Sequence, residues 1–126
     1  MSPQKKSPQK KTSVNDGKVE QYEKLLRTIP GLERKGAANP YTAMNGNMFT
    51  LLHQSQRLAL RLPEPQRTEF LKKYTTRLFE AYGTIMPEYV AVPDSLLENT
   101  QALGKYLHAS YEYVKTLKPK ATKKKS

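Results

Sequence analysis

The dipeptide Asn45-Gly46 constrains the fold of this chain more than any other feature of its sequence. It joins two extended segments, and Asn-Gly tolerates the positive φ angles that the two-residue turn of a β-hairpin requires. A third extended segment follows the polar stretch 53–56, whose length is typical of a connection between antiparallel neighbours. The sequence therefore predicts a three-stranded meander over about 41–45, 47–53 and 57–62.

The third strand of this meander has two different faces. Leu58, Leu60 and Leu62 alternate with Ala59 and Arg61, so the two-residue period predicts a buried leucine face and a solvated opposite face. We interpret the solvated face as a candidate surface for a protein partner, because it presents a mixed apolar area that can pair or pack with another chain. Its predicted residues are Thr50, Leu52 and Arg61. The alternative is that these residues only complete the sheet.

Helical segments flank the strands. Apolar residues at three- and four-residue spacing from Val19 predict a first helix, with Asn15 or Asp16 as its N-terminal cap and the Pro30-Gly31 pair as its end. Pro63 and Pro65 suit the first turn of a second helix, which is predicted to end near residue 73. The remaining predicted elements are strands near 76–80 and 87–92 and a last helix with a first turn at 95–98 and a longer part at 99–117.

The order of these elements predicts an α+β fold. It is a two-layer α-β(3)-α-β(2)-α arrangement in which helices pack on an antiparallel sheet. A chain of 126 residues with 37% hydrophobic content has material for one modest core. The predicted organisation is a disordered basic arm at 1–18, one folded domain at 19–117 and a disordered lysine-rich tail at 118–126.

The positive charge of the chain is concentrated at its two ends. The net charge is +11; residues 1–18 hold five lysines against one aspartate, and residues 115–126 hold six lysines and no acid, so the part between them carries only +1. The arm repeats the pentapeptide SPQKK, a pattern similar to the basic tails that lie on DNA. The alternative is a tail that only increases solubility. Contacts of these lysines with phosphates would depend little on the base sequence of the nucleic acid. The candidate residues are Lys5, Lys6, Lys10, Lys11, Lys118, Lys120, Lys123, Lys124 and Lys125.

The residue types that support catalysis or metal binding are sparse. The chain has no Cys, and His53 and His108 have no zinc-binding spacing. Glu80 and Glu88, from neighbouring predicted strands, are the one candidate acid and base pair, and solvation at the surface is the alternative. We therefore predict a protein that is not an enzyme, with no cofactor and no metal. No apolar run reaches the length of a membrane span, so we expect no membrane partner and a cytoplasmic location.

Several short motifs occur along the chain in a fixed order: Gly46-Asn47-Met48-Phe49, Leu58-Ala59-Leu60-Arg61-Leu62, Tyr89-Val90-Ala91-Val92-Pro93 with Leu96-Leu97, Leu103 to Tyr106, and Ser110-Tyr111. Together they resemble the N-terminal domain of the TfoX/Sxy family. The resemblance covers about residues 19–117, and its motifs fall in the family's order and approximate spacing. Residues 34–40 stand in place of the family's usual R-x-M-F-G-G approach to the hairpin, and a lysine-rich tail follows the matched part where the regulators carry a second helical domain, so the resemblance is to the stand-alone members.

The resemblance implies the same α-β(3)-α-β(2)-α fold and a regulatory role. Competence regulators of this family act in the bacterial cytoplasm on transcription, together with the cyclic-AMP receptor protein. Our first hypothesis is therefore a non-enzymatic interaction domain linked to transcription, with a protein partner and with basic tails for electrostatic contacts. The second is a small nucleoid-associated protein that binds DNA or RNA with little sequence preference. The sequence leaves the partner and the oligomeric state open.

Overall fold

The computed structural model describes residues 16–36, 39–81 and 83–119. These residues form one antiparallel sheet with helices packed on it, so the predicted α+β class and two-layer arrangement are confirmed. The predictions for residues 1–15 and 120–126 lie outside the described residues. The elements are α1 (Asp16–Leu26), β1 (Tyr41–Met44), β2 (Asn47–Leu52), β3 (Leu58–Arg61), α2 (Glu64–Lys73), β4 (Leu78–Ala81), β5 (Thr84–Val92), α3 (Asp94–Leu97) and α4 (Thr100–Lys115).

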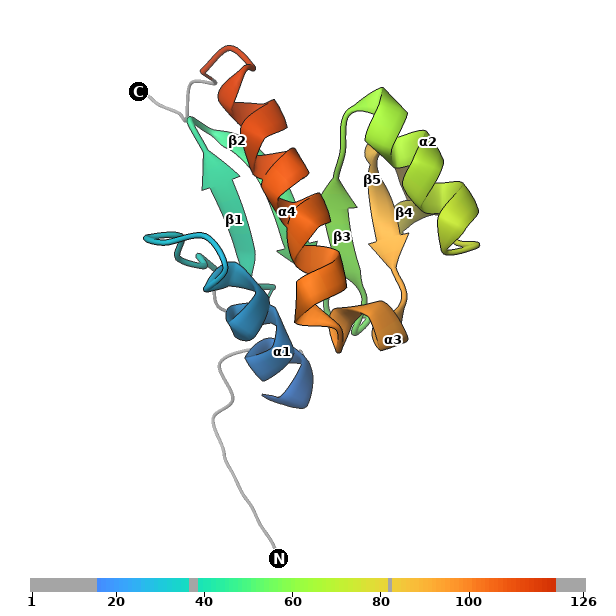
Figure 1. Cartoon of the computed structure of the whole chain (residues 1–126), viewed down its shortest axis with the longest axis horizontal. Coiled ribbons are helices and arrows are strands. Elements are labelled where there is room, and N and C mark those ends of the chain that lie inside the picture. Colours follow the sequence, from blue (N-terminus) through green and yellow to red (C-terminus); the bar gives the residue numbers. More distant parts are fainter. Residues whose placement is uncertain (1–15, 37–38, 82, 120–126) are drawn as a thin grey trace, which may run out of the picture.

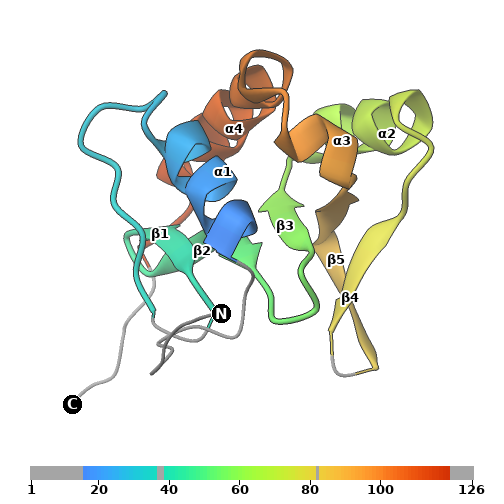
Figure 2. The ribbon, with the colours of Figure 1, turned by 90° about the horizontal axis from the view of Figure 1, so that it is seen from below.

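The sheet has the strand order β1-β2-β3-β5-β4, and every neighbouring pair is antiparallel. Figure 1 looks onto the helices, with α4 crossing the sheet diagonally between α1 and α2. Figure 2 shows that α1, α2, α3 and α4 all lie on the same side of the sheet. The opposite side is therefore free of any helix formed by the described residues.

The hairpin between β1 and β2 forms where the sequence predicts it. Asn45 has a φ of 54° and Gly46 a φ of 82°, the left-handed pair that a type I′ turn requires. Helix α1 begins at Asp16, where its N-terminal cap is predicted, but it ends at Leu26, before the predicted end at Pro30-Gly31. Lys18, assigned by the prediction to the disordered arm, is part of α1 and forms an ion pair with Asp94 at the start of α3.

A bulge interrupts the alternation of β2. Thr42 of β1 is opposite Thr50, but the next residue, Ala43, is opposite Met48, so Phe49 is an extra residue without a partner in β1. The extra residue allows two consecutive side chains, Phe49 and Thr50, to face the helices, and both are fully buried. From Thr50 onward, each side chain of β2 therefore lies on the face of the sheet opposite to the one that strict alternation from Phe49 would give.

The bulge places the Thr50 hydroxyl in a buried polar chain. Its Oγ1 lies 2.6 Å from the hydroxyl oxygen of Tyr22 on α1 and 2.6 Å from Oγ1 of Thr42 on β1. All three residues are fully buried, and burial raises the pKa of the Tyr22 phenol far above its usual range. Hydrogen bonding satisfies groups that would otherwise destabilise the core. These three hydrogen-bonded hydroxyl groups thus attach α1 to the first two strands.

Apolar side chains fill the space between the helices and the sheet. Asn99 caps α4 by accepting a hydrogen bond from the backbone N–H of Ala102. From there α4 places its apolar stripe against the strands, and Tyr111 contacts Phe49 with ring centroids 5.8 Å apart. The fully buried members of this core with the largest side chains include Tyr22, Phe49, Phe70, Leu25, Leu52, Leu58, Leu60, Leu62, Leu103 and Leu107.

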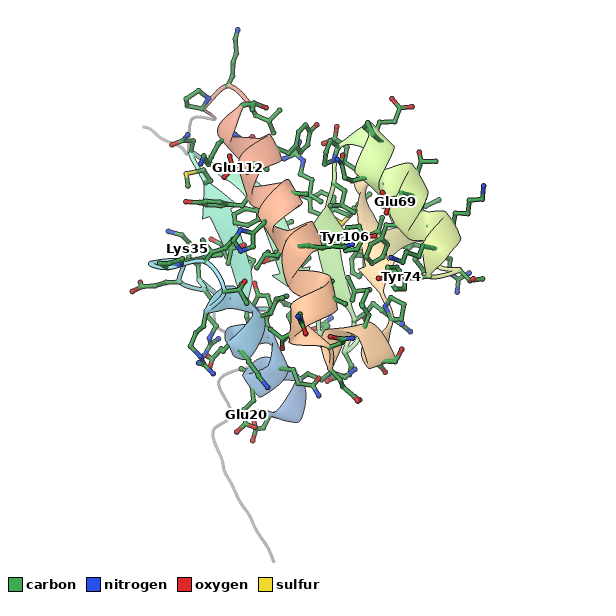
Figure 3. The ribbon with its side chains drawn as sticks, viewed as in Figure 1. Glu20, Lys35, Glu69, Tyr74, Tyr106 and Glu112 are labelled. Atoms are coloured by element: carbon green, nitrogen blue, oxygen red, sulfur yellow. The ribbon has the colours of Figure 1, made fainter. Side chains whose placement is uncertain are left out.

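Helices α2 and α4 meet through aromatic rings. The rings of Phe70 and Tyr106 cross at 90° with centroids 5.0 Å apart, and Tyr74 lies against both. Figure 3 shows Glu69, Tyr74 and Tyr106 together in the space between the two helices. The Tyr106 hydroxyl donates to Oε2 of Glu69 over 3.1 Å, and burial, reinforced by this carboxylate, raises the pKa of Tyr106 to about 12. The phenol is therefore neutral at physiological pH.

Helix α2 ends in a Schellman motif that is built on a threonine. The Thr76 N–H donates to the carbonyl of Leu71 and the Thr75 N–H to that of Lys72, which closes the last turn. Thr75 has a φ of 49°. Glycine is the usual residue at this position, because a β-branched side chain in the left-handed region is strained. The end of α2 is thus held in a strained conformation.

We predict that Thr50→Val lowers the free energy of unfolding by about 1–3 kcal/mol, because it keeps the shape of the side chain and removes the hydroxyl that Tyr22 and Thr42 share. Urea titration followed by circular dichroism measures the change. Thr68→Val on the exposed surface of α2 is the matched control and should change stability by less than about 0.5 kcal/mol. Equal stability of the two variants would contradict a stabilising role of the hydroxyl chain.

We predict that Thr75→Gly raises the free energy of unfolding by about 1 kcal/mol, because glycine adopts the left-handed conformation without strain. The neighbouring Thr76→Gly is the control and should lower it, because the Thr76 hydroxyl donates to the Ala91 carbonyl over 2.7 Å. Thermal and urea unfolding of both variants test the pair. A Thr75→Gly variant less stable than the wild type would contradict the interpretation of strain.

Candidate functional site

The helix-free side of the sheet has an apolar centre. Leu51 of β2 is opposite Tyr41 on one side and Ala59 on the other, and Ala59 is opposite Ala91 of β5. Because directly opposed residues share a face, these four side chains form one row across four strands. Ala59 also belongs to a second, smaller apolar cluster with Phe79 and Ala81 of β4, around which Leu51, Met86, Tyr89 and Ala91 pack.

The predicted partner surface at Thr50 and Leu52 is wrong. Both residues are fully buried, and their cross-strand partners Leu60 and Leu58 belong to the core beneath the helices. The bulge at Phe49 is the reason, because it exchanges the faces of β2 in the middle of the strand. The half-buried Met48 and Leu51 occupy the helix-free face instead.

Arg61, the third predicted residue, is at the end of β3 and is only partly accessible. Its Nε donates to Oε1 of Glu88 over 2.7 Å, and its Nη1 approaches the Met48 carbonyl at 3.4 Å. The guanidinium carbon lies 5.8 Å from the ring centroids of both Tyr89 and Tyr113, within the range of cation–π attraction. Arg61 therefore joins β2, β3, β5 and α4 at one end of the sheet.

The two tyrosines around Arg61 are held in their neutral form. The Tyr89 hydroxyl donates to the Met48 carbonyl over 2.7 Å, and the Tyr113 hydroxyl donates to Oε2 of Glu88 over 3.2 Å. Burial raises the pKa of both phenols, and the Glu88 carboxylate raises that of Tyr113 further. These groups donate hydrogen bonds to fixed acceptors, as structural tyrosines do.

The two carboxylates predicted as a candidate acid and base pair have different surroundings. Glu88 is bonded to Arg61 and to Tyr113. Glu80 is exposed on β4, directly opposite Ile85, and lines a hollow that Glu88 does not line. The geometry therefore does not unite them in one cleft, and the arrangement gives no support to acid–base catalysis by this pair.

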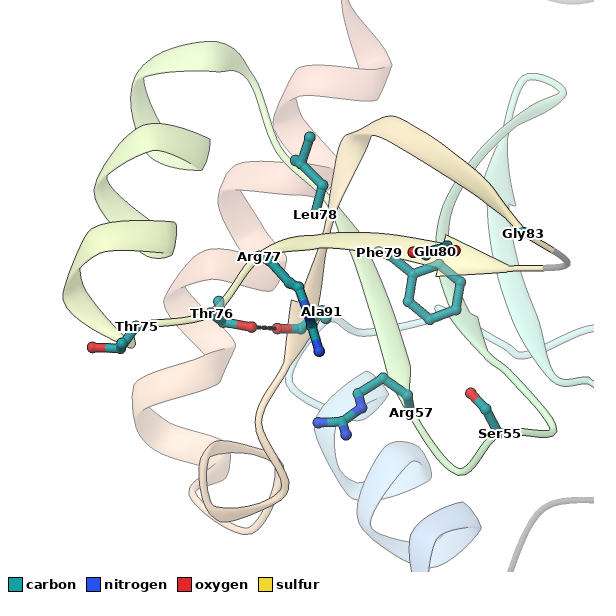
Figure 4. A pocket seen from close by; sticks show the side chains of 10 residues that line it. All are labelled: Ser55, Arg57, Thr75, Thr76, Arg77, Leu78, Phe79, Glu80, Gly83 and Ala91. Atoms are coloured by element: carbon teal, nitrogen blue, oxygen red, sulfur yellow. Dashed lines mark hydrogen bonds between the residues drawn. The ribbon is translucent and has the colours of Figure 1, made fainter.

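A hollow of about 690 Å³ opens at the end of the sheet formed by β3, β4 and β5. Figure 4 shows Arg57 and Arg77 extending toward one another across it, with the Phe79 ring beside them. Sequence reasoning missed this juxtaposition, because the two arginines belong to different segments and match no motif. The residues lining the hollow are Ser55, Arg57, Thr75, Thr76, Arg77, Leu78, Phe79, Glu80, Gly83 and Ala91.

The two histidines occupy structural positions. His53 follows β2 and is nearly buried; its Nδ1 lies 3.0 Å from the Ser55 hydroxyl, and its ring meets the Phe79 ring edge-on. His108 is exposed on α4, with Nε2 donating to the Thr28 carbonyl over 3.1 Å. Within the described ranges, no group of three or more His, Cys, Asp or Glu side chains is placed to hold a metal ion.

Of the candidate phosphate contacts at the chain ends, the structure describes one. Lys118 is exposed, and its backbone carbonyl accepts a hydrogen bond of 3.0 Å from Nδ2 of Asn47. The other eight predicted lysines lie outside the described residues. In the part of the chain that the structure describes, no helix has the length and apolar character needed to cross a membrane.

Comparisons of this chain with protein families, with curated proteins and with solved structures gave no match.

We predict that Glu88→Gln lowers the free energy of unfolding by about 1–2 kcal/mol, because it replaces a charged acceptor for Arg61 and Tyr113 by a neutral amide. Glu80→Gln is the matched control: Glu80 is exposed, and its change should stay within about 0.5 kcal/mol. Parallel urea titrations of the two variants measure the difference. An equal loss of stability in both would show that the contacts around Arg61 contribute nothing specific.

Proposed function

We propose that this chain is a non-enzymatic interaction domain, similar to the N-terminal domain of the TfoX/Sxy family, that regulates transcription by binding a protein partner in the bacterial cytoplasm. The observation that carries the proposal is the helix-free face of the sheet. A sheet that packs helices on one side only leaves its other face to solvent or to a partner. Here that face has an apolar row in which Leu51 and Ala91 are partly exposed and flank the buried Ala59.

The composition of this face suits a protein partner. Tyr41, Ala43, Met48 and Leu51 are half-buried and adjacent, since Tyr41 is opposite Leu51 and Ala43 is opposite Met48. Protein interfaces are enriched in aromatic residues and Met at their centres and are depleted of charged side chains there. Arg61 lies at the edge of the same area and is already neutralised by Glu88. The area replaces the predicted surface at Thr50 and Leu52.

The experiment that tests the proposal uses the partner that the family resemblance implies. Purified cyclic-AMP receptor protein, loaded with cyclic AMP, is bound to a labelled DNA fragment that holds its site, and the full chain is added. In a gel-shift assay, we expect the chain to bind and form a complex that migrates more slowly than the receptor–DNA complex alone. We expect Leu51→Glu and Ala43→Glu to weaken binding of the chain at least about tenfold, because each substitution buries an unpaired charge in the contact.

Gln101→Glu on the exposed surface of α4 is the control, since it changes the net charge by the same amount on the helix side. Circular dichroism of each variant checks that it is folded. No complex with the wild-type chain, or equal binding by Leu51→Glu, Ala43→Glu and Gln101→Glu, would contradict the proposed surface and partner.

The second candidate function is a nucleoid-associated protein that binds DNA or RNA with little sequence preference. The observation that favours it is the charge distribution, with five lysines in residues 1–18 and six in residues 115–126. Lysines of this kind neutralise phosphates without reading bases, so affinity falls steeply as salt rises. The same gel-shift assay includes DNA without the receptor protein. Binding there that is equal in all the surface variants would favour this second function.

A further inference from the structure

We propose that the hollow between Arg57 and Arg77 is a contact site for the phosphate backbone of a nucleic acid. The inference places a nucleic-acid contact on the folded domain, in addition to the terminal lysines of the second candidate function. It does not depend on the protein partner of the first. The argument starts from the two arginines, which come from separate parts of the chain: Arg57 precedes β3, and Arg77 precedes β4.

The two guanidinium groups extend into the same space (Figure 4), and neither belongs to an ion pair of the described residues. The ion pairs of the described residues are Lys18–Asp94, Arg34–Glu23, Arg61–Glu88 and Lys115–Glu112, and neither Arg57 nor Arg77 takes part in any of them. Like charges repel at close range, whereas an anion between them would be attracted by both. The planar fork of guanidinium donors matches the oxygens of a phosphate.

The backbone beside each arginine is held in an uncommon conformation. Gln56, immediately before Arg57, has a φ of 71°, and Thr75, two residues before Arg77, has a φ of 49°. The Arg77 carbonyl accepts from the Ala91 N–H over 2.9 Å, and the Thr76 hydroxyl donates to the Ala91 carbonyl over 2.7 Å. Strained residues that the surrounding structure holds in place are concentrated at functional sites. Here Thr75 lines the hollow, and Gln56 lies between two residues that line it.

The lining favours a phosphate backbone over a base or a small apolar ligand. Phe79 is only 1% exposed, so its ring is not available to stack on a base. The accessible hydrogen-bond donors of the side chains in the lining are the two guanidinium groups and the exposed Ser55 and Thr75, the donor types that contact phosphates in nucleic-acid complexes. Contacts of this kind are tolerant of sequence. The site is therefore a positioning contact and not a reader of sequence.

Positively charged side chains outside the hollow extend the positive region that Arg57 and Arg77 form. Lys72 and Lys73 are exposed in the last turn of α2, which leads directly to Thr75. A single phosphorylated side chain would use only the hollow, whereas a nucleic-acid strand can continue from the hollow onto these lysines and onto the basic chain ends. Glu80 opposes binding, because its carboxylate also lines the hollow. Its presence predicts a modest affinity that increases when this charge is removed.

The test measures binding of the full chain to a short fluorescein-labelled duplex of mixed sequence by fluorescence anisotropy over a series of salt concentrations. The double variant Arg57→Gln/Arg77→Gln is compared with Lys24→Gln/Arg27→Gln, which removes two exposed charges from the end of α1 and the turn that follows it. The two variants have the same net charge. We expect the hollow variant to bind about tenfold more weakly than this control, with a salt slope smaller by about one to two.

Two further variants sharpen the result. Glu80→Gln should raise the affinity about threefold, because it removes the one repulsive carboxylate from the hollow. Arg57→Lys/Arg77→Lys keeps the charge and loses the guanidinium fork, so it should bind more tightly than the glutamine pair and more weakly than the wild type. All the changed residues are exposed, and circular dichroism confirms that each variant is folded.

Three outcomes would overturn the inference. If the wild-type chain does not bind the duplex or the matching single-stranded RNA at low salt, both the hollow and the basic ends fail as nucleic-acid contacts. If the wild type binds but the hollow variant equals the control pair, the hollow alone fails and the ends remain. If only inorganic phosphate or a phosphorylated peptide binds in a manner that depends on Arg57 and Arg77, the ligand class is wrong.

Discussion

The bulge at Phe49 is the constraint on which the rest of the structure depends. It allows Phe49 and Thr50 to face the helices together, so one strand supplies a ring for α4 and a hydroxyl for α1. It also leaves the Met48 carbonyl accessible to the Tyr89 hydroxyl and to Arg61 at the end of the sheet. Both sides of the sheet are therefore organised by one inserted residue.

The two sides of the sheet serve different purposes. The helix side is filled with large apolar side chains, and the polar groups that we describe in it are hydrogen-bonded to one another. The other side has only a small apolar cluster around Ala59 and Phe79. Glu88, the more enclosed carboxylate of the predicted pair, connects Arg61 to Tyr113, so it stabilises the end of the sheet. An antiparallel sheet that is packed against helices on one side and solvated on the other commonly shows this division.

Local chemistry made much of the fold predictable. The Asn45-Gly46 turn, the two prolines at the start of α2 and the three- and four-residue spacing of α1 and α4 each act within a few residues, and the predicted order of elements is confirmed. The faces of β2 were not predictable in this way, because the bulge depends on how β1 and β2 pair. A strict two-residue count from Phe49 places Thr50 and Leu52 in solvent, whereas both are buried.

The hollow illustrates the same limit at longer range. Arg57 and Arg77 are distant in sequence, and only the pairing of β3 with β5 and of β5 with β4 brings their segments together. The sequence near Arg77 also gives no sign of the strained end of α2, because Thr75 occupies the position where a helix end usually has glycine. Nothing in that residue type predicts its φ of 49°. A site of this kind is assembled by the sheet, so it becomes visible only when the strand order is known.

The strand β3 separates the two proposed binding areas. Arg57 immediately precedes β3 and faces the hollow, while Arg61 ends it beside the area around Met48 and Leu51. Four residues of extended chain span about 13 Å, which exceeds the Debye length of about 8 Å at physiological salt. The Glu88 carboxylate also neutralises Arg61 directly. A charge bound at one end of β3 should thus have little influence on the other, so a phosphate contact and a protein contact can coexist on one face and be removed separately by mutation.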